Sequence, residues 1–526
     1  MKGPQGGMSK PKYRIGVDVG GTNTDAVVMA GRTVLAGVKA PTTRDVTTGV
    51  LEALAGVLEK SGVGRDEISA VVIGTTHFTN AIIERRHLAP TAIVRLGLPA
   101  TQGLLPMVDW PDDLREAIGR HCALAHGGNE FDGREISPLD EDELRRIGQA
   151  VAAKGIRAIA VSSVFSPVDG QMEARAARVL ESACPGARVV LSSHIGRLGL
   201  LERESAAILN ASLLDLAERT VDAFATALQS CGLTCRFFIS QNDGTLMDGA
   251  QVKRYPVLTF GSGPTNSMRG AAFLSGHSDA IVIDVGGTTT DVGLLQHGFP
   301  REAATTVSIG GVRTNFRMPD VFSFGLGGGS IVEKQGDSTV VGPRSVGYEI
   351  TQKALTFGGD VLTATDIAVA LGLAKIGDPA KVAHLDGRML YAAKQVMDDM
   401  VERAVERSRV SAARIPVIAV GGGSILIRDR IVDLDVLRPE NFAVANAVGA
   451  AIAQVSGEVD RVFSLSGGLT RDQALGEAEA IARDKAIAAG AVVDTIVAVE
   501  REDVPLAYLP GNATRIRVKV VGDIEI

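Results

Sequence analysis

The stretch Ile15-Gly-Val-Asp-Val-Gly-Gly-Thr-Asn-Thr-Asp25 returns half a chain later as Ile281-Val-Ile-Asp-Val-Gly-Gly-Thr-Thr-Thr-Asp291. Eight of the eleven positions are identical in the two copies. Each copy is an apolar segment that runs into a glycine–threonine turn and then into a second apolar segment, a pattern typical of an antiparallel hairpin. The repeat therefore predicts two lobes of similar design, each of which opens with the same strand, turn and strand.

Each turn combines two glycines, threonine hydroxyls and an aspartate at the end of the first strand. Consecutive glycines let the backbone turn tightly and point N–H groups into one concavity, which is a common way to bind phosphate. Asp18 and Asp284 would repel a phosphate directly, so they favour a divalent cation between carboxylate and phosphate. A glycine-rich hairpin with a solvated aspartate would explain one copy, but folding alone does not require the same residues twice.

Outside the repeat, helix and strand candidates alternate between residues 139 and 191, which indicates α/β layering. A third glycine-rich turn, Gly421-Gly-Gly-Ser424, follows the strand candidate 416–420. We divide the chain into a disordered arm or tag (1–12), an N-terminal lobe (13–205), a second lobe (206–440), a helix that returns to the first lobe (441–455) and a small C-terminal α/β appendage (456–526).

Composition excludes several classes of protein. The 526 residues suggest about three domains, or two large lobes with an appendage. A net charge of -7 and an aromatic content of 4% argue against a nucleic-acid or anionic-membrane partner. No apolar run reaches the roughly 20 residues that span a bilayer, no signal peptide is expected over residues 1–12, and the 4 cysteines are too sparse for a disulfide framework. We therefore expect a cytoplasmic protein.

Other nucleotide and hydrolase signatures are missing from the sequence. It contains no G-x-x-x-x-G-K-[ST] P-loop, no G-x-S-x-G elbow and no HExxH helix. The glycine-rich run Gly325–Ser330 lacks the final glycine and the βαβ context of a dinucleotide loop. The repeated turns are therefore the best candidates for a functional site.

The three glycine-rich turns resemble the phosphate-1, phosphate-2 and adenosine segments of the actin/Hsp70/sugar-kinase superfamily. More closely, the chain resembles the hydantoinase/oxoprolinase family of the ATP-dependent A-subunit type (N-methylhydantoinase A). The matching segments stand in the family's order and cover about residues 13–455: they are Gly16–Asp25, Gly74-Thr-Thr-His-Phe-Thr-Asn80, Glu202-Arg-Glu-Ser-Ala-Ala-Ile-Leu-Asn-Ala211, Gln241-Asn-Asp-Gly-Thr-Leu-Met247, Ser262-Gly-Pro264, Asp284–Asp291, Gly327-Gly-Gly-Ser-Ile331 and Thr365-Asp366.

The resemblance implies an α/β fold of two ribonuclease-H-like (actin-like ATPase) lobes with an interlobe cleft, followed by the small C-terminal appendage. It implies ATP-dependent opening of a cyclic amide, such as a hydantoin, 5-oxoproline or a lactam, by phosphoryl activation of the amide oxygen. A partner subunit or a homo-oligomer is expected. The alternatives are a small-molecule kinase, an ATP-dependent carboxylase subunit and a regulatory ATPase of the same superfamily.

The resemblance also assigns roles to residues. Asp18 and Asp284 would hold Mg²⁺ (or Mn²⁺), and Asp291 would orient water or support the metal. ATP would lie against the three turns, that is, against Gly20, Gly21, Thr22, Asn23, Gly286, Gly287, Thr288, Thr289, Gly421, Gly422 and Gly423. Thr75, Thr76 and Asn80 are candidates for contact with the substrate or the γ-phosphate, with helix capping as the alternative. The charges of Glu202, Arg203 and Glu204 are interpreted as a solvated face or as interlobe ion pairs.

Overall fold

The repeated stretch forms two antiparallel hairpins in the computed structural model, which describes residues 13–42, 46–303, 306–336, 338–409, 414–465, 468–507 and 512–524. Asp18 lies opposite Asp25 in the first hairpin, and Asp284 lies opposite Asp291 in the second. In each case a later strand runs parallel to the first strand of the hairpin. The two lobes therefore begin alike, as the repeat predicts. The arm expected over residues 1–12 lies outside the described residues.

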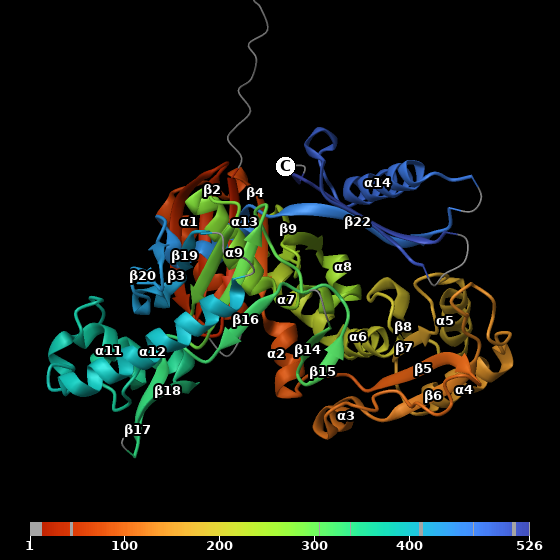
Figure 1. The fold of residues 1–526 in the computed structure, drawn as a ribbon, viewed down its shortest axis with the longest axis horizontal. Helices are drawn as coiled ribbons and strands as arrows, with labels where there is room; N and C mark the ends of the chain where they lie inside the picture. The colour runs from red at the N-terminus through yellow and green to blue at the C-terminus, as the bar shows by residue number, and fades with distance from the viewer. Residues whose placement is uncertain are drawn as a thin grey trace, which may run out of the picture.

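The first hairpin belongs to a nine-stranded sheet, which Figure 1 shows from the red strands of the N-terminal part to the blue strands of the C-terminal part. Its strands, in spatial order, are β23 (Val497–Pro505), β24 (Thr514–Gly522), β22 (Gln454–Phe463), β10 (Thr245–Asp248), β9 (Arg236–Ser240), β4 (Ile68–Thr75), β1 (Tyr13–Val19), β2 (Asn23–Ala30) and β3 (Thr33–Pro41). The central strands are almost wholly buried, as expected for strands that are covered on both faces.

The second hairpin belongs to a seven-stranded sheet. Its strands are β13 (Phe299–Pro300), β12 (Thr290–Gln296), β11 (Ala280–Val285), β19 (Val417–Val420), β21 (Leu434–Leu437) and β20 (Arg430–Ile431), with β16 (Val321–Phe324) paired to β12. Two short hairpins flank this part of the chain, β14 (Val307–Ile309) with β15 (Val312–Thr314) and β17 (Ser330–Gln335) with β18 (Ser338–Ser345).

A third sheet interrupts the first lobe. It is four-stranded and parallel, in the order β6 (His121–His126), β5 (Thr91–Leu98), β7 (Ala158–Ser163) and β8 (Arg188–Leu191). Its strands pack with neighbouring helices into a separate apolar core that includes Val94, Ile159 and Leu180. In Figure 1 this unit lies at lower right, away from α11 and α12 at lower left.

The helices cover these sheets. They are α1 (Val46–Ser61), α2 (His77–Glu84), α3 (Asp112–Ile118), α4 (Glu141–Ala153), α5 (Gln171–Ala183), α6 (Leu200–Ser212), α7 (Leu214–Ser230), α8 (Gly249–Arg254), α9 (Ser262–Ser275), α10 (Ile350–Lys353), α11 (Ala364–Ala370), α12 (Gly387–Ser408), α13 (Ala445–Ala451) and α14 (Arg471–Ala488). None of the helices in the described ranges is long and apolar enough to cross a membrane.

The sheets correct the expected boundary between the lobes. The boundary predicted at residue 205 would place β9 and β10 in the second lobe, but β9 pairs with β4 of the first sheet. The strands of the second sheet begin only at Ala280. This pairing could not be predicted from the sequence, because α6 and α7 separate β9 from the earlier strands of its sheet.

The small α/β appendage predicted over residues 456–526 is continuous with the first sheet. Strand β22 pairs in parallel with β10, so β22, β24 and β23 extend the first sheet. The helix expected over residues 441–455 is shorter, since β22 begins at Gln454. This helix, α13, does return to the first lobe, where it packs against β1 and β2.

The two faces of the C-terminal strands differ in chemistry. One face is apolar and packs on α14, where a Cβ added to Gly457 would lie 1.8 Å from the Ala482 carbonyl oxygen. The opposite face is charged, and Arg517 pairs there with Glu500 at 2.6 Å and with Glu302 at 2.7 Å. Arg317 also contacts Glu302, at 3.3 Å. Because Glu302 and Arg317 lie between β13 and β16, this charged layer ties the first sheet to a segment of the second lobe.

Helices α9 and α13 lie in direct backbone contact. A Cβ added to Gly270 would lie 1.8 Å from the Ala445 carbonyl oxygen, and one added to Gly449 would lie 1.8 Å from the Asn266 carbonyl oxygen. Gly16 of β1 meets α13 in the same way, 2.0 Å from the Ala447 carbonyl oxygen. Only glycine leaves room for these approaches, and they bring both helices to the end of β1.

Candidate functional site

The two repeated turns face each other in the structure. A Cβ added to Gly287 of the second turn would lie 2.1 Å from Thr22 Oγ1 of the first, and one added to Gly21 would lie 4.0 Å from Thr288 Oγ1. Gly21 and Thr289 are exposed, whereas Thr22 is buried. The turns thus form one surface that a ligand can reach and that two separate lobes contribute to.

Asp18 is held at the end of β1 by amides from two helices. Asn446 Nδ2 of α13 donates to Asp18 Oδ2 at 3.0 Å, and Asn266 Nδ2 of α9 donates to Asp18 Oδ1 at 3.4 Å. On the other side, a Cβ on Gly74 would lie 2.4 Å from Asp18 Oδ1. Burial and the nearby charges of Asp25 and Asp284 raise the pKa of Asp18 to about 6. The influence of Asp284 on Asp18 shows that the two strand ends share one electrostatic environment.

Asp25, opposite Asp18, belongs to the same site, although it was not among the predicted site residues. Its side chain is 4% exposed and pairs with Lys39 Nζ of β3 at 2.6 Å. Burial raises the pKa of Asp25, and Lys39 opposes this rise. The repeat itself held the signal for Asp25, because Asp25 occupies the position of Asp291. Lys39 had no such signal, since only the pairing of β2 with β3 brings it to the site.

The second hairpin is similar to the first, and its Asp284 also lies against the third glycine turn. Desolvation raises the pKa of Asp284, although Ser267 donates a hydrogen bond to it. Gly421 has a φ of +83°, and a Cβ there would lie 2.3 Å from Asp284 Oδ1. Ser323 Oγ donates a short hydrogen bond to Asp291, and desolvation raises the pKa of Asp291 to about 7. The structure therefore brings together the three predicted aspartates and all three glycine turns.

Several polar atoms around these turns are buried without a hydrogen-bond partner. In the described part of the chain they include Thr22 Oγ1, Asp25 Oδ1 and Ser424 Oγ. A buried polar atom that lacks a partner costs free energy, so such atoms cluster where a ligand completes them. Four carboxylates with one paired lysine also leave an excess of negative charge. A ligand that carries a cation suits this surface.

The described residues do not form a closed metal cage, since no three Asp, Glu, His or Cys side chains converge as ligands. Mg²⁺ does not need one, because it is usually held by one or two carboxylates together with phosphate oxygens and water. Asp18 and Asp284 supply hard oxygen donors of that kind. The residues present therefore fit a Mg²⁺ ion that arrives with a polyphosphate.

The predicted substrate residues lie beside this site, at the start of α2. Thr75 ends β4 next to Val19 of β1. Its hydroxyl accepts from the His77 backbone N–H at 3.1 Å, and the Thr76 hydroxyl accepts from Asn80 Nδ2 at 3.4 Å. Thr76 is the N-cap residue of α2, but its side chain makes no capping hydrogen bond. Whether Thr75, Thr76 and Asn80 also contact a substrate stays a prediction.

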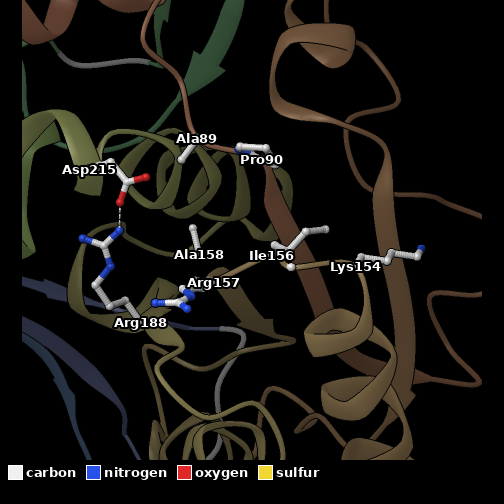
Figure 2. Close-up of a pocket in the computed structure, with 9 residues that line it drawn as sticks. Ala89, Pro90, Lys154, Ile156, Arg157, Ala158, Arg188 and Asp215 are labelled. Carbon is white, nitrogen blue, oxygen red and sulfur yellow. Dashed lines mark hydrogen bonds and ion pairs between the residues drawn. The ribbon is translucent and has the colours of Figure 1, made fainter.

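A cavity lies elsewhere, at the base of the four-stranded sheet. Figure 2 shows its lining, in which Arg188 pairs with Asp215 and Arg157 lies nearby. Its volume is about 170 Å³, and none of the predicted site residues lines it. The candidate site is thus identified by the three glycine turns and their aspartates, not by this cavity.

Two models of known protein families match the chain. Residues 14–184 match the hydantoinase/oxoprolinase N-terminal region, and residues 203–406 match hydantoinase/oxoprolinase. The chain belongs to the hydantoinase/oxoprolinase family.

Curated members similar to this hydantoinase/oxoprolinase chain are subunits of larger enzymes. The acetophenone carboxylase gamma subunit of Aromatoleum aromaticum is 29% identical over 68% of this chain and 53% of the relative. The caprolactamase subunit alpha of Pseudomonas jessenii is 27% identical over 84% of this chain and 66% of the relative. The chain thus spans about half to two thirds of the length of these relatives.

Solved structures confirm the fold of this family member. One is the ATP-dependent caprolactamase of Pseudomonas jessenii, which superposes with a TM-score of 0.79 at 20% sequence identity. The match covers 98% of this chain and 88% of the caprolactamase chain. Another is the nucleotide-free acetone carboxylase, with a TM-score of 0.71 at 16% sequence identity. This match covers 98% of this chain and 88% of the carboxylase chain. The predicted α/β class with two actin-like lobes is thereby confirmed.

Proposed function

We propose that this chain is the ATP-using subunit of an enzyme that opens a cyclic amide of the hydantoin, 5-oxoproline or lactam type. The observation that carries the proposal is the meeting of two Asp-Val-Gly-Gly-Thr turns, with Thr22 of one against Gly287 of the other. The caprolactamase relative favours a lactam-like ring. A partner subunit is part of the proposal because both curated relatives are named as subunits.

The chemistry needs positioning and charge more than it needs a protein nucleophile. An amide carbonyl is a poor electrophile, and transfer of the γ-phosphoryl group of ATP to the amide oxygen, with ADP as the leaving group, makes its carbon open to attack by water. In this proposal the backbone of the glycine turns and Thr22 hold the phosphates. A bound Mg²⁺, held by Asp18 and Asp284, would neutralise the phosphate charge.

Asp291 is the proposed proton acceptor of the site. A general base works best with a pKa near the working pH, and the pKa of Asp291 is raised to about 7. Ser323 holds one of its oxygens through a hydrogen bond. The ionised carboxylate would take a proton from the attacking water.

We also propose that the enzyme works in the cytoplasm, because ATP is its co-substrate.

The second candidate is the ATP-using subunit of a carboxylase, which the acetophenone carboxylase relative favours. Both reactions activate an oxygen by phosphorylation, so the same turns would serve either one. A kinase of the same superfamily would differ in leaving the phosphate on its product.

The test is ADP release by the purified chain, alone and together with its partner subunit, with hydantoins, 5-oxoproline, lactams, or an aryl ketone with bicarbonate as substrates. We expect a cyclic amide to stimulate ATP turnover and to yield a ring-opened product with inorganic phosphate. Stimulation by ketone and bicarbonate alone would favour the carboxylase, and a stable phosphorylated product would favour a kinase. If no pairing and no compound stimulates turnover, the cyclic amide assignment is wrong.

A further inference from the structure

Lys39, on the third strand of the first sheet, lies beside the candidate site. Its ammonium group pairs with Asp25 at 2.6 Å. The charge of Lys39 also acts to lower the pKa of Asp284, across the interface between the lobes. The charge of Lys39 thus stabilises the ionised form of carboxylates from both repeated hairpins.

The same side chain reaches the third glycine turn. A Cβ added to Gly422 would lie 3.4 Å from Lys39 Cε and 4.0 Å from Lys39 Nζ. The end of the lysine therefore lies where the first hairpin, Asp284 and the third turn come together. This is the place at which the proposed function puts the phosphates of a nucleotide.

The strand that carries Lys39 is fastened to the first turn. Just after β3, the Thr42 backbone N–H donates to the Thr22 carbonyl oxygen at 3.0 Å, and Thr42 Oγ1 donates to the Gly20 carbonyl oxygen at 2.8 Å. Because of these bonds, the backbone of Lys39 and the first turn keep a fixed relation.

A purely structural ion pair does not account for all of these features. The side chain of Lys39 is 32% exposed, while that of Asp25 is 4% exposed and keeps one oxygen without a partner. A partly exposed ammonium can turn from a carboxylate to an arriving anion at little cost in burial. Four carboxylates would repel a polyphosphate, and the ammonium group of Lys39 would add to the neutralisation that a bound Mg²⁺ provides.

We propose that Lys39 is a phosphate-binding residue, whose ammonium group shares or leaves Asp25 and donates to a phosphate oxygen of the bound nucleotide. This inference rests on the proposed function, since it requires that the site bind ATP. The ligand class is a nucleoside polyphosphate, and Lys39 would contribute charge and hydrogen-bond donation.

The test is Lys39→Met, with the binding of adenosine, ADP and ATP measured by calorimetry in the presence of Mg²⁺. Loss of a charge-assisted contact should weaken the affinity for ATP by about 10- to 100-fold and leave the affinity for adenosine unchanged. The matched control is Lys60→Met. Lys60 Nζ donates to the Gly37 carbonyl oxygen of the same strand, away from the turns, and its loss should leave all three affinities unchanged.

A double variant distinguishes two roles of Lys39, the binding of phosphate and the neutralisation of the Asp25 charge. Lys39→Met alone leaves Asp25 buried without its partner, which lowers stability. Asp25→Asn combined with Lys39→Met removes both charges and should restore the melting temperature, but ATP binding should stay weak. Recovery of wild-type ATP affinity in the double variant would show a structural ion pair and overturn this inference.

The remaining outcomes are also distinct. If the wild-type chain binds ATP and Lys39→Met binds it within about twofold of wild type, the inference alone is wrong. If the wild-type chain binds none of the three ligands, the proposed function is wrong and the inference falls with it.

Discussion

The aspartates at the ends of the two hairpins are costly to keep in the folded state without a ligand. Burial raises the pKa of Asp18 to about 6, and desolvation raises that of Asp291 to about 7. An acid with a raised pKa keeps its proton in the folded state at pH values where the unfolded chain has lost it. Stability therefore falls as the pH rises from about 4 to about 7. This trade of stability for a prepared site is common at functional positions.

Asp291→Asn should remove one part of that cost. We expect the free energy of unfolding of the nucleotide-free, metal-free protein to rise by roughly 2 to 4 kcal/mol at pH 8 and to change little at pH 3, because at pH 3 Asp291 is largely protonated in both the folded and the unfolded state. Urea unfolding at the two pH values measures the difference. A gain of the same size at both pH values would point to packing instead of the carboxylate charge.

Asp18→Ala and Asp284→Ala should each lower ATP turnover by at least about 100-fold, because each removes a carboxylate proposed to face the metal. The fold should persist, since both side chains sit at strand ends, and circular dichroism checks this. The control is Asp435→Ala, whose side chain is 82% exposed and whose loss should leave turnover unchanged. Full activity in both active-site variants would place the site elsewhere.

Among single residues, the candidate site residues inside the repeat could be predicted from the sequence. Residues that reach their partners only through tertiary contacts could not. Asp18, Asp284 and Asp291 could be predicted as candidate site residues because the motif occurs twice, and their roles stay predictions. The expectation for Arg203 and Glu204 was wrong: these side chains are 1% and 2% exposed, and Glu204 accepts from Arg95 Nε at 2.7 Å in the interior. Charged residues usually face solvent, and the buried arginine partner stands on a strand far away in the sequence.

Among the elements, the contact between α9 and α13 decides how well the site is formed. The two helices carry Asn266 and Asn446, and each asparagine donates to a different oxygen of Asp18. A change in the distance between the helices would therefore alter the position of the carboxylate as well as the packing. Catalytic groups tolerate such displacements poorly.

Gly270→Ala should separate the helices, since its Cβ would lie 1.8 Å from the Ala445 carbonyl oxygen. We expect a loss of about 2 kcal/mol in the free energy of unfolding, together with lower ATP turnover. Gly476→Ala is the control, because Gly476 lies in α14 with nothing within 4 Å of the added Cβ. It should raise stability by about 0.5–1 kcal/mol and leave turnover unchanged. Equal losses of stability in both variants would contradict the contact argument.

Element types were easier to predict than their partners. The hairpins followed from alternation and turn residues, and a helix was expected at residues 441–455. The structure keeps only Ala445–Ala451 as helix and turns Gln454 and the residues after it into β22, because pairing with β10 and β24 overrides local preference. Strand pairing between distant segments leaves no periodic trace in the sequence.

Across the whole molecule, the charged layer under the C-terminal strands holds two sheets together. Arg317 has a side chain that is 11% exposed and contacts Glu302, Glu458 and Glu500. Burial is the largest cause that raises the pKa of Glu500 to about 7. A buried network of this kind depends on each of its members, because removal of one leaves the others uncompensated.

Arg317→Met should therefore lower the free energy of unfolding by about 3 kcal/mol, since Glu302, Glu458 and Glu500 lose one of the two arginines that they share and keep Arg517. Arg344→Met is the matched control. Its side chain is 69% exposed, it pairs with Glu333 on the β17–β18 hairpin, and its loss should cost under about 0.5 kcal/mol. Denaturant unfolding of both variants at pH 8 measures the contrast. Similar small losses would mean that the layer contributes nothing to holding the sheets together.

The order of strands in the nine-stranded sheet has a consequence for biosynthesis. Strand β22 pairs with β10, so β10 keeps one open edge until the ribosome has made residues Gln454–Phe463. The four-stranded sheet, in contrast, is contiguous in sequence from β5 to β8 and has its own core. Domains that are complete fold as they emerge. The nascent chain would thus carry one folded unit beside an incomplete lobe, whose exposed strand edge needs protection from aggregation until β22 has been made.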